Sequence, residues 1–334
     1  MNQTVKKNFV LLGILLTVTL AGFGFTAVTG GFEKAEIKDD KFRIVTSFYP
    51  VYIAALNITD GLEDVEVTNM TENAGGCLHD YQLTAADMKK LEHADVFVIN
   101  GAGMELFMES IEKAYPELTV IDTSKGITLL EAAEHVHGAE EEAAFHQEDI
   151  HIHEEEEIEE EYNHGAENGH IWMNPDNYIV QIHTMSEGLG KLDKKNHKAY
   201  EENAYRYIEK IEAVGNELEL VREGHAEEPI VIFHDSYAYL AEKLHFHIVH
   251  QVVIEEDTSM SAGEIAEIME EIRAHDVSVL LAEKQFSEQI PTRIAEETGT
   301  KVVIVDSLVS GPMDKDAYIN GMMENIRILK EELK

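Results

Sequence analysis

The chain has 334 residues and carries 65 Asp and Glu against 26 Lys and Arg, so its formal charge is −39 with His neutral. A surface of this sign repels phosphate, which excludes nucleic acid as a partner. An apolar content of 44% is typical of a folded protein, and the length indicates about two domains. Because the chain has 17 His but a single Cys, Cys77, a disulfide framework and a multi-cysteine zinc finger are excluded. Any metal site must therefore use imidazole and carboxylate groups.

Residues 1–32 are typical of a signal peptide or an N-terminal membrane anchor. Lys6 and Lys7 precede an uncharged run, 8–32, that is rich in Leu, Val, Phe and Gly. This run could also span a bilayer of about 30 Å, with the two lysines on the cytoplasmic side. No Cys follows it, so lipid attachment there is not expected. We expect an extracytoplasmic protein, at the cell surface or in a periplasm, and leave cleavage and an uncleaved anchor as alternatives.

From residue 42 onward, short apolar runs alternate with helical patterns, which predicts βα units and a parallel sheet. The expected strands are 43–47, 65–69, 96–100 and 119–122. The expected helices between them are 51–58, 85–91 and 104–114. These elements belong to a predicted N-terminal lobe at 41–175.

An acidic, His-rich tract at 134–170 interrupts this order. It contains fourteen acids, seven His and no Lys or Arg, so it predicts a solvated loop, 134–169, rather than a packed segment. An acidic run such as 154–161 often serves solubility alone, but His-rich tracts in exported proteins favour metal capture. The candidates for secondary, weak metal binding are His135, His137, His146, His151, His153 and His164.

A helical region at 176–222 follows, and Asn174 with Pro175 forms its cap and first turn. We expect Gly188 and Gly190 to break it. The second part, 194–221, has an apolar stripe at helical spacing and would be about 40 Å long, enough to join two lobes. A plain surface helix of one lobe is the alternative.

After residue 228 the βα rhythm returns. The expected strands are 230–233, 248–253, 277–282 and 302–306, and the expected helices are 262–275, 292–298 and 315–332. They form a predicted C-terminal lobe at 228–334. The fold class is therefore α/β, with two lobes that each contain a four-stranded parallel sheet and flanking helices, joined by a long rigid helix.

Three side chains that follow strands are candidate metal ligands, because ligands of open α/β sheets bind beyond the carboxyl ends of strands, and a fourth lies between the acidic tract and the Asn174 cap. They are His79, His170, His234 and Asp306. Taken singly, each has a structural alternative: a strand-end His often only forms hydrogen bonds, and Asp306 could cap the following turn. Cys77 is best explained as a small buried side chain.

Four runs of sequence carry a family resemblance when they are taken in order. They are GGCLHDYQLTAADMKKLEHADVFVINGAGME, HIWMNP, FHDSYAYLAEKLHF and VDSL. In this order and spacing they resemble the metal-binding subunits of bacterial zinc and manganese ABC importers. The resemblance covers the chain from about residue 42 to its end. It implies a metal held between two metal-binding lobes by one residue from each run: His79, His170, His234 and Asp306.

The resemblance also bears on the metal. Manganese members of the family tend to have a carboxylate in the third motif, whereas zinc members have a His, and this chain has His234. Three imidazoles with one carboxylate or water suit tetrahedral Zn²⁺, whereas Mn²⁺ prefers more oxygen ligands. The chain departs from the family by the missing lipid-anchor Cys and by the sequence LHDYQL, where many relatives have a proline.

We therefore expect a monomeric zinc-binding component of an ABC importer, whose partners are a membrane permease and its ATPase. A manganese-binding protein of the same kind and a surface zinc buffer or adhesin remain alternatives. An exported zinc hydrolase is disfavoured, because the chain has no H-E-x-x-H helix and four protein ligands leave no open position for catalysis.

Overall fold

The computed structural model describes residues 41–71, 78, 81–132, 167–252, 260–284 and 289–333. All the elements named below lie in one compact unit, Phe42–Lys334. No helix within the described ranges has the length and apolar character needed to cross a bilayer. The predictions for 1–32, for His79 and for the tract from 133 to 166 fall outside these ranges.

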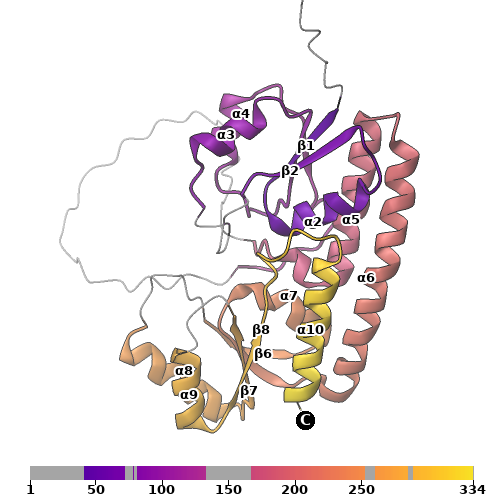
Figure 1. The fold of residues 1–334 in the computed structure, drawn as a ribbon. Coiled ribbons are helices and arrows are strands. Elements are labelled where there is room, and N and C mark those ends of the chain that lie inside the picture. Colours follow the sequence, from indigo (N-terminus) through magenta and orange to yellow (C-terminus); the bar gives the residue numbers. More distant parts are fainter. Residues whose placement is uncertain are drawn as a thin grey trace, which may run out of the picture. The chain divides into compact units, whose positions relative to one another are not determined.

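The first half of the chain forms a four-stranded parallel sheet in the order β2-β1-β3-β4 (Figure 1). Its strands are β1 (Phe42–Thr46), β2 (Val65–Asn69), β3 (Val96–Ile99) and β4 (Val120–Asp122). Its helices are α2 (Tyr49–Ile58), α3 (Ala85–Leu91) and α4 (Met108–Ala114). The predicted strands are confirmed to within a residue at each end, because buried parallel strands consist of nearly uninterrupted apolar residues.

The second half repeats the same topology, with the order β6-β5-β7-β8. Its strands are β5 (Pro229–Ile232), β6 (His247–Gln251), β7 (Val279–Glu283) and β8 (Lys301–Val305). Its helices are α7 (Ala238–Leu244), α8 (Ala262–Ala274), α9 (Gln289–Thr298) and α10 (Ala317–Glu332). The predicted fold class of two four-stranded parallel sheets is confirmed, and α7 is a helix that the sequence pattern did not reveal.

The C-terminal sheet is buried on both faces, because successive side chains along β5 and the residue after it pack into two different cores. Ile230 and Ile232 pack into the large core that also contains the N-terminal sheet and the long helices. Val231 and Phe233 point to the other face and pack against α8 and α9. Successive side chains of a strand point to opposite faces, so one apolar run supplies both cores.

Two antiparallel helices, α5 (Pro175–Leu192) and α6 (His197–His225), connect the sheets (Figure 1). At 1.5 Å per residue, the 29 residues of α6 span about 43 Å. α6 contacts α2 beside the first sheet, and α7 and α10 beside the second. Its buried side contains all five residues of the predicted stripe, Tyr200, Ala204, Ile208, Ile211 and Leu218, together with Tyr207, Val214 and Val221. The prediction of a long helix that joins the lobes is confirmed, and the alternative of a surface helix of one lobe is excluded.

The predicted helix break at Gly188 and Gly190 is wrong. α5 runs through both glycines, and the chain turns only after Leu192. A β-carbon at Gly188 would lie 2.7 Å from Cδ1 of Ile121, and one at Gly190 would lie 2.1 Å from Nδ1 of His197. The glycines therefore permit close packing inside a continuous helix.

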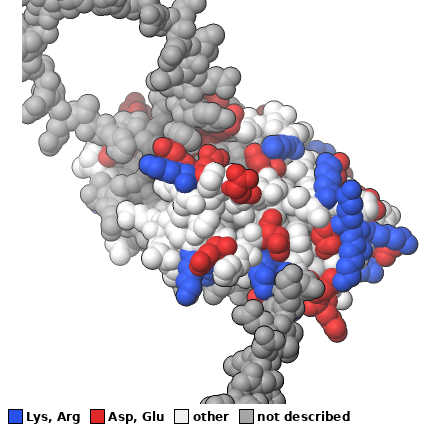
Figure 2. Space-filling view, turned by 90° about the horizontal axis from the view of Figure 1, so that it is seen from above, with Lys and Arg blue, Asp and Glu red and all other residues white. Residues whose placement is uncertain are grey.

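Acidic side chains are scattered over the face shown in Figure 2, with several Lys and Arg among them. The sequence accounts for this spread, because fourteen of the acids lie in the tract 134–170 and the remaining formal charge of about −25 (−39 + 14) is distributed over the rest of the chain. Such a surface favours solubility and attracts cations in general.

Candidate metal centre

His234 lies directly beyond the central part of the C-terminal sheet. β5 lies between β6 and β7 in the sheet. From β5 the chain passes to β6 on one side, and it then crosses over β5 to β7 on the other side. This is the switch point at which open α/β sheets bind ligands. The residue is the N-cap of the short helix η3 (Asp235–Tyr237), and its Nδ1 accepts a hydrogen bond of 3.1 Å from the backbone N–H of Ser236. Only 8% of its side chain is exposed.

His170 lies at the start of another short helix, η2 (Ile171–Met173), and is fully buried. Oδ1 of Asn168 accepts a hydrogen bond of 2.9 Å from the backbone N–H of His170 and lies 2.9 Å from Nδ1 of the same residue. Because an amide oxygen only accepts, Nδ1 carries the ring proton and Nε2 carries the lone pair that can bind a metal. The predicted cap is confirmed a few residues further on, where Oδ1 of Asn174 accepts from the N–H of Asp176 at 3.0 Å.

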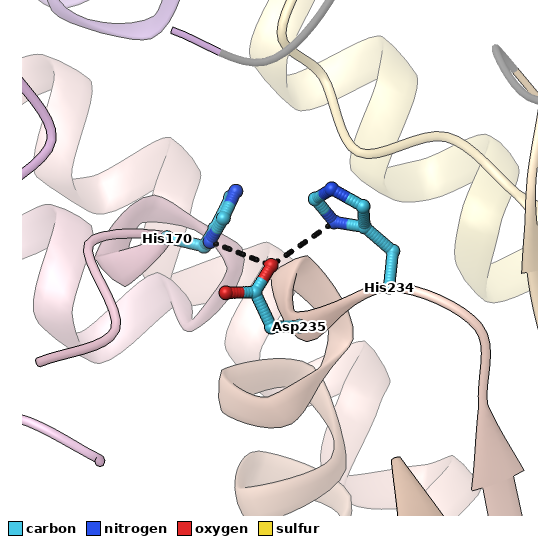
Figure 3. Close-up of side chains that lie close together, drawn as sticks. All are labelled: His170, His234 and Asp235. Carbon is cyan, nitrogen blue, oxygen red and sulfur yellow. Dashed lines mark ion pairs between the residues drawn. The ribbon is translucent and has the colours of Figure 1, made fainter. Parts of the chain in front are cut away.

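The fold brings these two histidines together from segments 64 residues apart in sequence. Their ring centroids lie 5.1 Å apart, with the ring planes at 86°. Oδ1 of Asp235 lies between them, 3.4 Å from Nδ1 of His170 and 3.3 Å from Nδ1 of His234 (Figure 3). In the described part of the chain, these three residues form a group whose ligand atoms all lie within 4.8 Å of one another.

The segment that carries His170 is fastened to the C-terminal half. The side-chain amide of Asn168 donates to the carbonyl of Asp235 at 2.8 Å, and the hydroxyl of Tyr239 donates to the carbonyl of Asn168 at 2.8 Å. The indole N–H of Trp172 donates to the carbonyl of Ser307 at 2.8 Å. These donors and acceptors are buried, so each bond is costly to break.

The same segment is also tied to the first sheet. Nδ2 of Asn100, at the end of β3, donates to the carbonyl of Gly169 at 2.9 Å. The position has no room for a side chain, since a β-carbon on Gly169 would lie 3.1 Å from the carbonyl oxygen of Ala102. His170 is therefore held at the junction of the two sheets, rather than by the N-terminal lobe alone as its place in the sequence suggested.

Glu283, at the end of β7, is a buried acid beside His234 that the sequence analysis missed. Its Oε2 lies 3.4 Å from Nδ1 of His234 and accepts from the hydroxyl of Ser236 at 3.4 Å, and its other oxygen accepts from the hydroxyl of Ser307. Burial raises the pKa of Glu283 to about 7, and the nearby charge of Asp306 adds to this rise. The sequence feature that could have identified Glu283 is its place at the end of the apolar run VSVLLAE, where an acid is expected to be buried.

Asp306 follows β8 directly, as predicted, and lines a cavity of 880 Å³. Its Oδ1 accepts from the backbone N–H of Leu308 at 2.9 Å, so the side chain does cap the following turn. Its Oδ2 lies 3.4 Å from the ammonium of Lys284. Asp306 is not a member of the group formed by His170, His234 and Asp235.

The described residues around the position of His79 are well anchored. Leu78 is 1% exposed, and the backbone N–H of Tyr81 donates to its carbonyl at 3.0 Å. The hydroxyl of Tyr81 donates to Asp87 at 2.8 Å, where Asp87 and Thr84 form the capping box of α3. The chain is thus fixed on the C-terminal side of His79. That residue, Cys77 and the six histidines between 135 and 164 remain predictions.

The chain is similar to known proteins over nearly its whole length. The family model of the zinc-uptake complex component A, periplasmic (ZnuA), matches residues 44–332. The high-affinity zinc uptake system protein ZnuA of Bacillus subtilis is 26% identical over 331 residues, which cover 97% of this chain and 96% of that protein. The zinc-binding protein AdcA of Streptococcus pyogenes is 24% identical over 333 residues, which cover 98% of this chain but 61% of AdcA.

Solved structures show the same fold. The solute-binding protein FpvC of Pseudomonas aeruginosa in complex with Mn²⁺ superposes with a TM-score of 0.71 at 24% identity, over 87% of this chain and 99% of that chain. A Zn(II)-bound mutant variant of AdcAII from Streptococcus pneumoniae gives a TM-score of 0.68 at 23% identity, over 88% and 99% of the two chains. At this level of identity the likeness establishes the two-sheet architecture alone.

Proposed function

The chain belongs to the zinc-uptake complex component A family, and from this premise we propose that it is the extracytoplasmic zinc-binding component of an ABC importer. It captures Zn²⁺ and passes it to a membrane permease. The observation that carries the proposal is the convergence of His170 and His234, buried at the junction of the two sheets with ring centroids 5.1 Å apart. The relatives described above that match over most of this chain are named as zinc-uptake or zinc-binding proteins.

The proposed ligands are His79, His170, His234 and Asp306. The geometry supports His170 and His234, whose Nε2 atoms lie on the ring edges away from Asp235 (Figure 3). For Asp306, the support is its place at the end of β8 and its charge. Because Oδ2 of Asp306 now faces Lys284, zinc must compete with an ammonium group for this carboxylate, and a water molecule is the alternative fourth ligand.

Titration calorimetry with Zn²⁺ and Mn²⁺ tests the proposal. We expect one tight zinc site in the wild-type protein, and a loss of at least about 100-fold in zinc affinity for His234→Ala. His183→Ala is the matched control, because His183 lies exposed on α5 and should bind zinc as the wild type does. Tight zinc binding by His234→Ala would refute the assignment.

The same titration decides between the metals. Zinc should bind more tightly than manganese, since imidazole nitrogens suit Zn²⁺ and Mn²⁺ prefers more oxygen ligands. Mn²⁺ is the alternative cargo, and a tighter Mn²⁺ complex would establish it. The complex of FpvC with Mn²⁺ shows that this fold accommodates that ion in another protein.

We propose that the tract 134–169 gathers Zn²⁺ at weak sites and that the tight site does not depend on it. Deletion of residues 140–163 should remove the weak, additional zinc equivalents and leave the tight one. If the deletion abolished tight binding, the tract would supply primary ligands and the proposed division of roles would be wrong.

We propose that the protein acts as a monomer with a permease and its ATPase, and has no catalytic role. Zinc-limited growth that needs both this protein and the permease would support transport. Zinc binding without any effect on uptake would favour a surface buffer or adhesin, and hydrolase activity lost with the metal would favour an enzyme. The mass of the exported protein distinguishes a cleaved signal peptide from an anchor at 1–32.

A further inference from the structure

We propose that Asp235 is a positioning residue that orients both imidazoles for zinc and does not itself bind the metal. This inference rests on the proposed zinc-binding function and deepens it. A single oxygen, Oδ1 of Asp235, lies 3.4 Å from Nδ1 of His170 and 3.3 Å from Nδ1 of His234. One carboxylate therefore faces the same ring atom of two histidines from distant parts of the chain (Figure 3).

The Nδ1 atoms are poorly placed to bind a metal. Nδ1 of His170 already lies 2.9 Å from Oδ1 of Asn168, and Nδ1 of His234 accepts the backbone N–H of Ser236 at 3.1 Å. A metal at Nδ1 of His170 would have to displace this buried hydrogen bond. At His234 the bond from the Ser236 N–H is lost in either case, because metal binding through Nε2 places the ring proton on Nδ1. In both rings Nε2 lies on the edge away from Asp235 (Figure 3), so we assign coordination to these two atoms.

Coordination through Nε2 fixes where the ring proton must be. A neutral imidazole that binds a metal through one nitrogen carries its proton on the other, and this N–H needs an acceptor. For His170 the acceptors are Asn168 and Asp235. For His234 they are Asp235 and Glu283, at 3.3 and 3.4 Å, and the Ser236 N–H must then turn away from Nδ1. Asp235 is the one acceptor among these that serves both rings.

The position of Asp235 is itself fixed. It is the first residue of η3, directly after His234, and 13% of its side chain is exposed. Its carbonyl accepts from Nδ2 of Asn168 at 2.8 Å, while Oδ1 of the same amide accepts from the backbone N–H of His170. Asn168 thus ties the backbone of Asp235 to that of His170, which keeps the two residues side by side.

Asp235 is separated from the coordinated metal by the rings themselves. Zinc at about 2.0 to 2.1 Å from each Nε2 would lie on the ring edges opposite the edge that faces Oδ1. The carboxylate therefore acts through the histidines. Acceptors of this kind, when removed, typically weaken metal binding by about 10 to 100-fold.

The test compares Asp235→Asn and Asp235→Ala with the wild type in zinc calorimetry, and records the visible spectrum of each protein with Co²⁺. We expect zinc to bind about 10 to 100-fold more weakly to both variants. The Co²⁺ bands should keep their positions, because the set of coordinating atoms is unchanged. Asp316→Asn is the control, since Asp316 lies exposed and pairs with Lys210 on the surface, and it should bind zinc like the wild type.

Two results would overturn the inference while the wild type still binds zinc. Unchanged zinc affinity in both variants would show that Asp235 does not orient the histidines. A Co²⁺ spectrum that loses an oxygen donor in Asp235→Ala would show that Asp235 is itself a ligand. Melting of each metal-free variant near the wild-type temperature excludes general unfolding as the cause. Failure of the wild type to bind zinc would instead refute the proposed function.

Discussion

Removal of one hydroxyl group at Tyr239 should loosen the segment that leads to His170. Tyr239 is fully buried, and burial raises its pKa to about 12, so the hydroxyl keeps its proton. It donates to the carbonyl of Asn168 at 2.8 Å and accepts from the backbone N–H of Leu130 at 3.0 Å. Leu130 and Asn168 lie on either side of the tract 133–166 in sequence, so this hydroxyl ties the two flanking segments together beside the site. Tyr239→Phe removes both bonds and keeps the ring.

The expected cost is about 2 kcal/mol. Asn168 has no exposed surface, so its carbonyl would remain without the partner it now has, at about 1 to 3 kcal/mol. Leu130 is half-buried, so water can replace part of its bond and the loss there is about 0.5 kcal/mol. Packing is preserved, since the aromatic ring is unchanged.

Urea unfolding of the metal-free protein measures this free energy. Tyr205→Phe is the control, because Tyr205 is 64% exposed and its hydroxyl should contribute nothing measurable. Zinc should also bind more weakly to Tyr239→Phe, since Asn168 holds Nδ1 of His170. An unfolding free energy within about 0.5 kcal/mol of the wild type would refute the reasoning, because such a value is typical of surface substitutions.

Three further predictions concern glycine packing in the helices, the buried acid Glu105 and the pH dependence of zinc binding. Gly188→Ala should destabilise the protein by about 1 to 3 kcal/mol, because the new methyl group would meet Ile121 at 2.7 Å. Gly224→Ala in α6 should stabilise the protein slightly, because the space around Gly224 is open and Ala favours a helix more than Gly does. Equal changes in melting temperature for Gly188→Ala and Gly224→Ala would refute this reasoning. Burial raises the pKa of Glu105 from the ordinary 4.5 to about 7. Between pH 4.5 and about pH 7, Glu105 is therefore protonated in the folded protein and ionised in the unfolded chain. Stability from this group is complete below pH 4.5 and is lost as the pH rises through 7, by up to roughly 3 kcal/mol. Glu105→Gln should flatten the unfolding free energy over that range, and an unchanged pH profile would disprove the assignment. Finally, zinc affinity should fall as the pH drops through about 6.5, because a protonated imidazole cannot coordinate, and calorimetry at about pH 5.5 and 7.5 checks this.

The strands and the long helix were predictable because their signal is local. Each strand is an apolar run between turns, and the buried stripe of α6, from Tyr200 to Val221, follows helical spacing. Gly188 and Gly190 misled the prediction, since a glycine that allows close packing looks the same in sequence as one that ends a helix. The helix α7 was missed because its sequence, AYLAEKL, is short and directly continues the His234 motif.

The site was predictable only in part, for a physical reason. A His at a strand end can be identified from the strand that precedes it, as His234 was. Its distant neighbours cannot be identified in this way, because Glu283 is far from His234 in sequence and reaches it through the fold. Asn168, which contacts His170, reaches the carbonyl of Asp235 in the same way. Asp235 is adjacent to His234, yet its contact with His170 depends on a distant, earlier segment of the chain.

The most direct test of the central claim is a crystal structure of the zinc-loaded protein with anomalous data at the zinc edge. We expect one strong peak bonded to Nε2 of His170 and Nε2 of His234, with Asp235 on the opposite side of both rings. A zinc peak bonded to neither histidine would contradict this expectation.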